Sequence, residues 1–218
     1  MSSKKIAVVL SGCGHLDGAE ITESVSTLIA LHQQGAVPSC FAPTVSFEPV
    51  NHFSQKSESE KRDAFTEAAR IARGAVQDLS ELKAADFDAI VFPGGFGAAK
   101  NLSDWASKGS NATVHPEVIR VLKEFRSAEK PIGAICIAPT LVAKVLGHKG
   151  VTVTIGNDKE TAAEIEKTGA HHENCPVDDY VTDREAKIIT TPAYMYDAKP
   201  DQVFKGISGL VKELVEMA

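Results

Sequence analysis

The chain has 218 residues, of which 43% are hydrophobic and 24% charged, as in an ordinary globular protein. Its net charge of -6 at pH 7 argues against nucleic acid and anionic membranes as partners, because binding phosphate groups needs a basic surface. No apolar run approaches the length of a transmembrane helix. The four cysteines form no CxxC pair and no zinc-site spacing, so we expect free thiols in a reducing compartment, the cytoplasm.

Apolar runs and amphipathic segments alternate along the chain. Continuous apolar runs predict buried strands at 6–10 and 87–92, and further strands are expected at 37–41 and 131–135. Helical spacing predicts helices at 19–34, 59–74, 116–128, 139–146, 161–168 and 201–216. A more exposed strand is expected at 151–155, and a hairpin at 180–182 and 187–190. The apolar face of the first helix combines Ile21, Val25, Leu28, Ile29 and His32.

This alternation predicts βαβ units, and hence one α/β domain over 1–218 with a mainly parallel sheet covered on both sides. Ligands of such sheets bind beyond the carboxyl ends of the strands. Three segments are expected at that edge: SGCGHLDGAE (11–20), PGGFGAAKN (93–101) and CIAPT (136–140). The polar, irregular stretch 43–57 is expected to be an interface or a lid.

Cys136 is the candidate reactive residue. It follows a predicted strand, and Pro139 suits an early position of the next helix. A thiol at this point faces the positive end of the helix dipole, which predicts a lowered pKa. The backbone N–H of Ile137 is placed to donate to a developing oxyanion. The alternative is a buried structural cysteine, and the strand-to-helix position favours reactivity.

The PGGFG segment is the candidate substrate-binding loop. Gly94 and Gly95 allow backbone conformations closed to other residues, and their N–H groups can bind an oxyanion. A plain tight turn is the alternative. The spacing does not match GxGxxG, so dinucleotide binding is not expected and no cofactor is implied.

Carboxylates and a second cysteine follow the first predicted strand. Glu20, at the start of the first helix, is expected to reach the thiol as a general acid and base, although it could simply satisfy the helix dipole. Asp17 has the character of a turn or cap residue, and Glu23 that of a solvated helix face. Cys13 in SGCG is a candidate neighbour of the substrate.

The chain has seven histidines, and a histidine is the usual activator of a catalytic thiol. His15, His115, His171 and His172 fall in loops or near strand ends, where each is readily explained as a surface residue. The segment HHENCPVDD collects metal-ligating residue types. Adjacent histidines in an extended segment point to opposite faces, so no metal site is expected.

The segments AICIAPT and PGGFGAAKNLS, together with the first-loop glutamate, resemble the DJ-1/PfpI superfamily. SGCG, CFAP, CPVDD and TTPAYM are similar to its ElbB or ES1-like branch, described as glyoxalases and linked to isoprenoid biosynthesis. The resemblance spans almost the whole chain. It implies a flavodoxin-like three-layer sandwich of class I glutamine amidotransferase type and a homodimer. It also implies that Cys136 is the nucleophile, with Glu20 as carboxyl partner and the Gly94–Gly95 loop beside the thiol.

The leading hypothesis is a cofactor-free, glutathione-independent glyoxalase that converts dicarbonyls such as glyoxal to 2-hydroxy acids. Cys136 would add to the aldehyde, Gly95 and Ile137 would bind the oxyanion, and Glu20 would carry the proton. One alternative is a redox sensor or small-molecule-binding protein that uses the same cysteine. Another is an amidase or deglycase, which requires a histidine near Cys136. Peptidase- and amidotransferase-like relatives often carry that histidine at the next position, which is Ile137 here.

Overall fold

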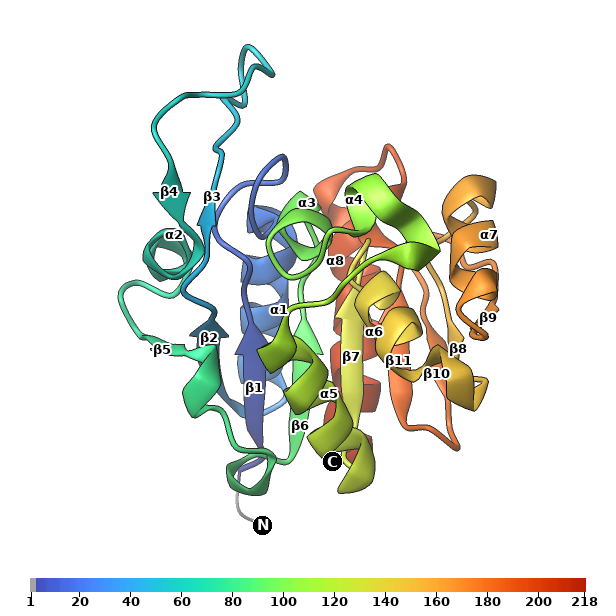
Figure 1. The fold of residues 1–218 in the computed structure, drawn as a ribbon. Helices are drawn as coiled ribbons and strands as arrows, with labels where there is room; N and C mark the ends of the chain where they lie inside the picture. The colour runs from blue at the N-terminus through green and yellow to red at the C-terminus, as the bar shows by residue number, and fades with distance from the viewer. Residues whose placement is uncertain (1–2) are drawn as a thin grey trace.

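The computed structural model describes residues 3–218, which build a central seven-stranded sheet (Figure 1). Its strand order is β10-β11-β7-β6-β1-β2-β5. The β10–β11 pair is antiparallel, and all other neighbours are parallel. The strands are β1 (Lys5–Val9), β2 (Val37–Ala42), β5 (Val76–Asp78), β6 (Ala89–Phe92), β7 (Ile132–Ile135), β10 (Val181–Asp183) and β11 (Ile188–Thr191). The predicted α/β fold with a mainly parallel sheet is confirmed.

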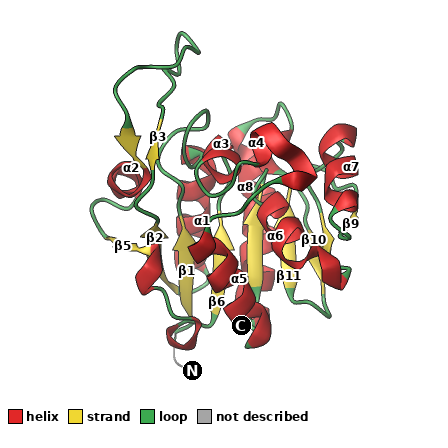
Figure 2. Cartoon of the chain, viewed as in Figure 1, coloured by secondary structure: helices red, strands yellow, loops and turns green. Residues whose placement is uncertain are grey.

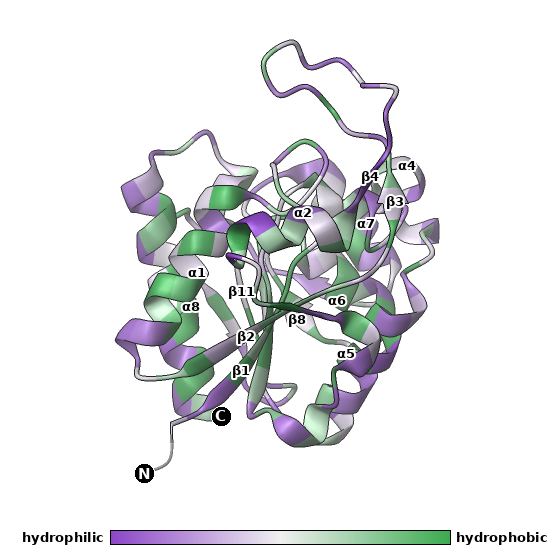
Figure 3. Ribbon diagram, turned by 90° about the vertical axis from the view of Figure 1, so that its left-hand side faces the viewer, coloured by the Kyte–Doolittle hydropathy of each residue, from purple (hydrophilic) through white to green (hydrophobic). Residues whose placement is uncertain are grey.

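Helices cover both faces of this sheet, as Figures 2 and 3 show. The helices are α1 (Ile21–Gln33), α2 (Ala64–Ile71), α3 (Phe96–Lys100), α4 (Trp105–Lys108), α5 (Pro116–Ser127), α6 (Pro139–Leu146), α7 (Lys159–Lys167) and α8 (Pro200–Met217). On β1, Ala7 and Val9 pack in the core beneath α5 and α6, while Ile6 and Val8 pack beneath α1 and α8. Successive strand residues thus serve opposite cores, which explains the unbroken apolar runs. No helix within residues 3–218 is both long and apolar enough to span a membrane.

The apolar face of α1 points to solvent rather than to the core. Ile21, Val25 and Ile29 are 49%, 40% and 46% exposed. The buried face consists mainly of small and polar residues: Glu23, Ser24, Ser26, Thr27, Ala30 and Leu31. Small side chains let α1 pack closely against α8, so hydrophobicity alone points to the wrong face of this helix.

Residues 48–61 form an arm that extends away from the sheet (Figure 1). The short antiparallel strands β3 (Ser46–Phe47) and β4 (Arg62–Asp63) pair at its base, and Phe53 on the arm is fully exposed. The helix predicted from residue 59 therefore begins at Ala64, because Asp63 caps it by accepting a hydrogen bond from the N–H of Thr66 at 2.9 Å.

The strand predicted at 151–155 lies outside the central sheet. It contains β8 (Thr152–Val153), which pairs in parallel with β9 (His171–His172) as a separate two-stranded sheet. The predicted hairpin corresponds to β10 and β11 and is confirmed.

Candidate functional site

Cys136 follows the last residue of β7, three positions before α6 begins. Its backbone has a positive φ of 62°, which is uncommon for a residue other than glycine. The N–H of Cys136 donates to the carbonyl oxygen of Thr191 at 2.9 Å, which ties this strained turn to the end of β11. Strained backbone of this kind is concentrated at functional sites. The predicted strand-to-helix position of Cys136 is thus observed, with the side chain only 7% exposed.

The carboxyl group in contact with this thiol belongs to Glu23, not to Glu20. Glu23 is fully buried and lies close enough to the thiol of Cys136 for each group to shift the pKa of the other. Its Oε2 accepts from the N–H of Gly94 at 3.0 Å, and its Oε1 accepts from the N–H of Tyr194 at 3.2 Å. The interpretation of Glu23 as a solvated residue was wrong because the inward face of α1 is its polar one.

Gly94 occupies a position that no other residue can fill without displacement. A Cβ atom there would meet the Cβ of Cys136 and would lie 2.7 Å from Oε2 of Glu23. The missing side chain of Gly94 thus allows the thiol and the carboxyl group to approach each other. The expectation that this glycine loop lies beside the thiol agrees with the structure.

Burial dominates the protonation of this pair. Burial, followed by the negative charge of Glu20, raises the pKa of Glu23 to about 8, so Glu23 is mainly protonated at neutral pH. Burial, followed by the charge of Glu23, also raises the pKa of Cys136 well above its ordinary value. The backbone N–H groups of Gly95 and Ile137 act in the opposite direction. The lowered thiol pKa expected from the helix dipole is therefore wrong, because desolvation outweighs these two backbone donors.

Glu20 supports the site from its rim. It is the N-cap of α1, and its Oε2 accepts from the N–H of Glu23 at 2.6 Å. The N–H of Glu20 donates to the carbonyl oxygen of Gly94 at 2.9 Å. Glu20 therefore orients the first turn of α1, which carries Glu23, while its own carboxylate lines the pocket in front of the thiol.

Cys13 lies away from this pocket. Its surroundings include Glu67 and Arg70 of α2, and partial burial raises the pKa of its thiol. The expected role of Cys13 as a substrate neighbour does not fit this placement, because the loop that carries it turns toward α2 before returning to the pocket.

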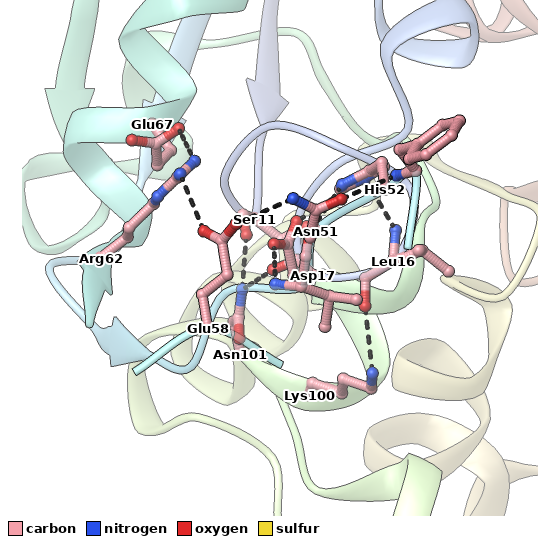
Figure 4. A network of polar contacts seen from close by, with 12 residues as sticks. Ser11, Leu16, Asp17, Asn51, His52, Glu58, Arg62, Glu67, Lys100 and Asn101 are labelled. Carbon is pink, nitrogen blue, oxygen red and sulfur yellow. Dashed lines mark hydrogen bonds and ion pairs between the residues drawn. The ribbon is translucent and has the colours of Figure 1, made fainter. Parts of the chain in front are cut away.

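The loop that carries Cys13 is held by a polar network that also reaches the arm (Figure 4). The buried carboxyl group of Asp17 accepts from the N–H of Val50 at 2.7 Å. The Asn101 side chain donates to the carbonyl oxygens of Ser11 and Asp17 at 2.8 Å and 2.7 Å. His52 of the arm stacks edge-on against His15 at 4.9 Å between ring centroids. Through Val50 and His52, the arm therefore contacts the loop that borders the thiol pocket.

The pocket in front of Cys136 has a volume of about 440 Å³. It is lined by His15, Glu20, Gly95, Phe96, Cys136, Ile137, Asp158, Glu160, Thr161, Tyr194 and Met195. The contributions from α7 and from η5 (Ala193–Met195) were not anticipated, since they come from distant parts of the chain. The TTPAYM segment, which carries part of the family resemblance, was the one sequence feature that could have indicated Tyr194 and Met195 as pocket residues.

Comparison with known proteins decides the family. The DJ-1/PfpI family profile matches residues 16–197. The chain belongs to the DJ-1/PfpI family. It is 46% identical to the human glutamine amidotransferase-like class 1 domain-containing protein 3, mitochondrial, over 98% of this chain and 83% of that protein. It is 44% identical to the rat ES1 protein homolog, mitochondrial, over 98% of this chain and 84% of that protein.

Among solved structures, an isoprenoid biosynthesis protein with an amidotransferase-like domain from Ehrlichia chaffeensis superposes on this DJ-1/PfpI chain with a TM-score of 0.91. The two are 37% identical, and the match covers 97% of this chain and 99% of that one. This similarity confirms the expected amidotransferase-like fold.

The expected cytoplasmic location is contradicted by the relatives, because the human and rat proteins are mitochondrial by name. Free thiols are compatible with any reducing compartment, so the cysteine argument did not distinguish between the two locations.

Histidine placement bears on the amidase alternative. His15 lines the pocket, but no hydrogen bond joins it to Cys136 within residues 3–218. His115 instead caps α5, where its Nδ1 accepts from the N–H of Glu117 at 3.2 Å. His171 and His172 form β9. Within the same described part of the chain, no group of three or more potential ligands is arranged to hold a metal ion.

Proposed function

We propose that this DJ-1/PfpI protein is a cysteine-dependent glyoxalase that converts glyoxal-type dicarbonyls to 2-hydroxy acids without glutathione. The observation that carries the proposal is the contact between Cys136 and a fully buried Glu23 at the base of a pocket of about 440 Å³. A nucleophile and a proton carrier of raised pKa are the two groups that this chemistry requires.

The reactive form of the pair carries one proton, on Glu23. The sulfur of Cys136 adds to an aldehyde carbon, and the backbone N–H groups of Gly95 and Ile137 beside the thiol stabilise the oxyanion. Glu23 gives its proton to that oxygen, which yields a hemithioacetal and leaves Glu23 as a carboxylate.

The Glu23 carboxylate then moves a proton between the two substrate carbons. It removes the proton from the carbon bonded to sulfur, giving an enediolate. The hydroxyl proton on that carbon moves to the neighbouring oxygen, and Glu23 returns its own proton to the neighbouring carbon. The first carbon is thereby oxidised to a thioester, and the second is reduced to an alcohol. Water attacks the thioester while Glu23 accepts its proton, which releases the hydroxy acid and restores the starting pair.

The pH dependence follows from this protonation state. The form with both groups protonated is inactive, and it predominates at neutral pH because burial raises the pKa of Glu23 to about 8 and that of Cys136 further. We therefore expect kcat/KM for glyoxal to rise about tenfold per pH unit between pH 6 and 7 and to reach its maximum above pH 8. A profile that falls across this range contradicts the assignment.

Steady-state turnover of glyoxal tests the residues. Cys136→Ser and Glu23→Gln are each expected to lower kcat by at least about 100-fold. Cys13→Ser is the matched control, because Cys13 lies outside the pocket, and it is expected to retain wild-type turnover. Wild-type turnover by Cys136→Ser would sink the proposal.

A further inference from the structure

The mouth of the thiol pocket carries three carboxylates. Glu20 is placed there by α1, while Asp158 and Glu160 are placed there by the start of α7. None of the three forms an ion pair within residues 3–218, whereas Glu164, one turn further along α7, pairs with Lys167. Hydrogen bonds from Thr161 lower the pKa of Asp158, so this carboxylate stays ionised.

No lysine or arginine among the described residues lines the pocket itself, although Lys100 Nζ lies 5.0 Å from the centroid of the Phe96 ring. Among the described residues that line it, His15 is the one basic side chain. Phe96, which is 46% exposed, and Tyr194 form aromatic walls. Carboxylates combined with aromatic faces are the groups that stabilise an ammonium ion. The buried thiol of Cys136 lies at the base of this pocket. The three carboxylates therefore surround the approach to a reactive group and are not simply a solvated acidic surface.

The pocket also continues beyond the thiol. Through Phe96, Ile137, Glu160 and Thr161 it joins a groove of about 950 Å³ that runs between α4 and α7. The N–H of Ser110 donates to Glu164 Oε2 at 2.7 Å, and both residues line this groove. A two-carbon dicarbonyl would leave most of this space unfilled.

We propose that the substrate is a carbonyl compound that carries an ammonium group, with the carbonyl carbon at Cys136 and the ammonium group beside Asp158 and Glu160. This assignment rests on the proposed function, since it takes Cys136 to react with a carbonyl carbon. The negative potential at the mouth raises the local concentration of cations and lowers that of anions. Anionic carbonyl compounds such as glyoxylate are therefore disfavoured.

Charged thiol reagents test the recognition without any turnover. The cationic reagent is trimethylammonioethyl methanethiosulfonate and the anionic one is sulfonatoethyl methanethiosulfonate. In both, the Cys136 sulfur attacks the reagent's sulfenyl sulfur, an S–S bond forms, and methanesulfinate leaves with the electron pair. Rates are measured at pH 8 by mass spectrometry of the Cys136 peptide in the Cys13→Ser background.

The cation-to-anion rate ratio is divided by the ratio for N-acetylcysteine. We expect a normalised ratio of roughly tenfold or more, which decreases as salt is added. Asp158→Asn, which keeps a capping residue, and Glu160→Gln are each expected to lower it about threefold. Glu166→Gln, on the same helix but outside the pocket, is the control of equal charge change and is expected to leave the ratio unchanged. A normalised wild-type ratio near one, or an equal loss in Glu166→Gln, overturns the assignment.

Turnover of matched phenylglyoxals separates this assignment from the proposed function. The para-trimethylammonio compound is expected to have a kcat/KM at least about tenfold higher than that of the para-carboxy compound. If neither compound is turned over but the labelling ratio favours the cation, the glyoxalase proposal fails and the ammonium site stands. If both are turned over equally and the labelling ratio is near one, the glyoxalase proposal stands and the ammonium assignment fails.

Discussion

Replacing Glu23 by glutamine removes a buried carboxyl group while nearly preserving its shape. Burial raises the pKa of Glu23 from 4.5 to about 8 in the folded protein, whereas the unfolded chain titrates near 4.5. Between these pH values the native state therefore binds one more proton than the unfolded state. The contribution of Glu23 to the free energy of unfolding is fully present below pH 4.5 and is lost as the pH rises toward 8.

The size of this effect can be worked out from the structure. Each pH unit corresponds to roughly 1.4 kcal/mol, so keeping Glu23 protonated at pH 7 costs about 3 kcal/mol relative to a neutral side chain. Glutamine avoids this cost. Its amide nitrogen cannot accept a hydrogen bond, so it loses one of the two bonds from the N–H groups of Gly94 and Tyr194, at a cost of about 1–3 kcal/mol. Glu23→Gln should be less stable than wild type at pH 5 and more stable at pH 8.

Urea unfolding at constant ionic strength from pH 5 to 8 measures this difference. We expect the stability of Glu23→Gln relative to wild type to increase by about 4 kcal/mol over that range. Cys136 adds nothing to the slope, because an unfolded thiol stays protonated up to its ordinary pKa of 9.0. Glu166→Gln, an exposed site, is the control and should show a nearly flat difference. A constant difference between Glu23→Gln and wild type would show that Glu23 is ionised in the native protein and would refute its role as a proton carrier.

Three further predictions concern packing, oxidation and assembly. Gly94→Ala places a Cβ atom against Cys136 and Glu23. Urea unfolding should show a free energy of unfolding lower by about 1–3 kcal/mol, and steady-state kinetics should show no glyoxal turnover. Mild peroxide at pH 7 should not oxidise Cys136 selectively, because burial raises the pKa of this thiol; selective sulfenic acid detected there by mass spectrometry would favour the redox-sensor alternative. We propose a homodimer whose interface buries the exposed apolar residues of α1, Ile21, Val25 and Ile29. The double substitution Val25→Lys and Ile29→Lys should then convert the dimer to a monomer in analytical ultracentrifugation. Unchanged sedimentation would contradict this interface.

The location of the site was predictable because it depends on strand ends. Apolar runs with glycine or proline after them placed Gly94, Gly95 and Cys136 at one edge of a parallel sheet, and the structure places them there. The carboxyl partner was not predictable by the same route. Glu20 and Glu23 are one turn apart on α1, and only the direction in which α1 packs decides which of them meets the thiol.

The sequence by itself determined the layered α/β architecture and the strand-to-helix turn at Cys136, because both follow from local patterns of apolar residues, glycine and proline. Only the tertiary structure decided the protonation chemistry. The pKa values of Glu23 and Cys136 depend on how completely water is excluded, and that exclusion is produced by segments far apart in the chain, the Gly94 loop, η5 and α1. Desolvation is a property of the assembled fold, so no local pattern in the sequence reports it.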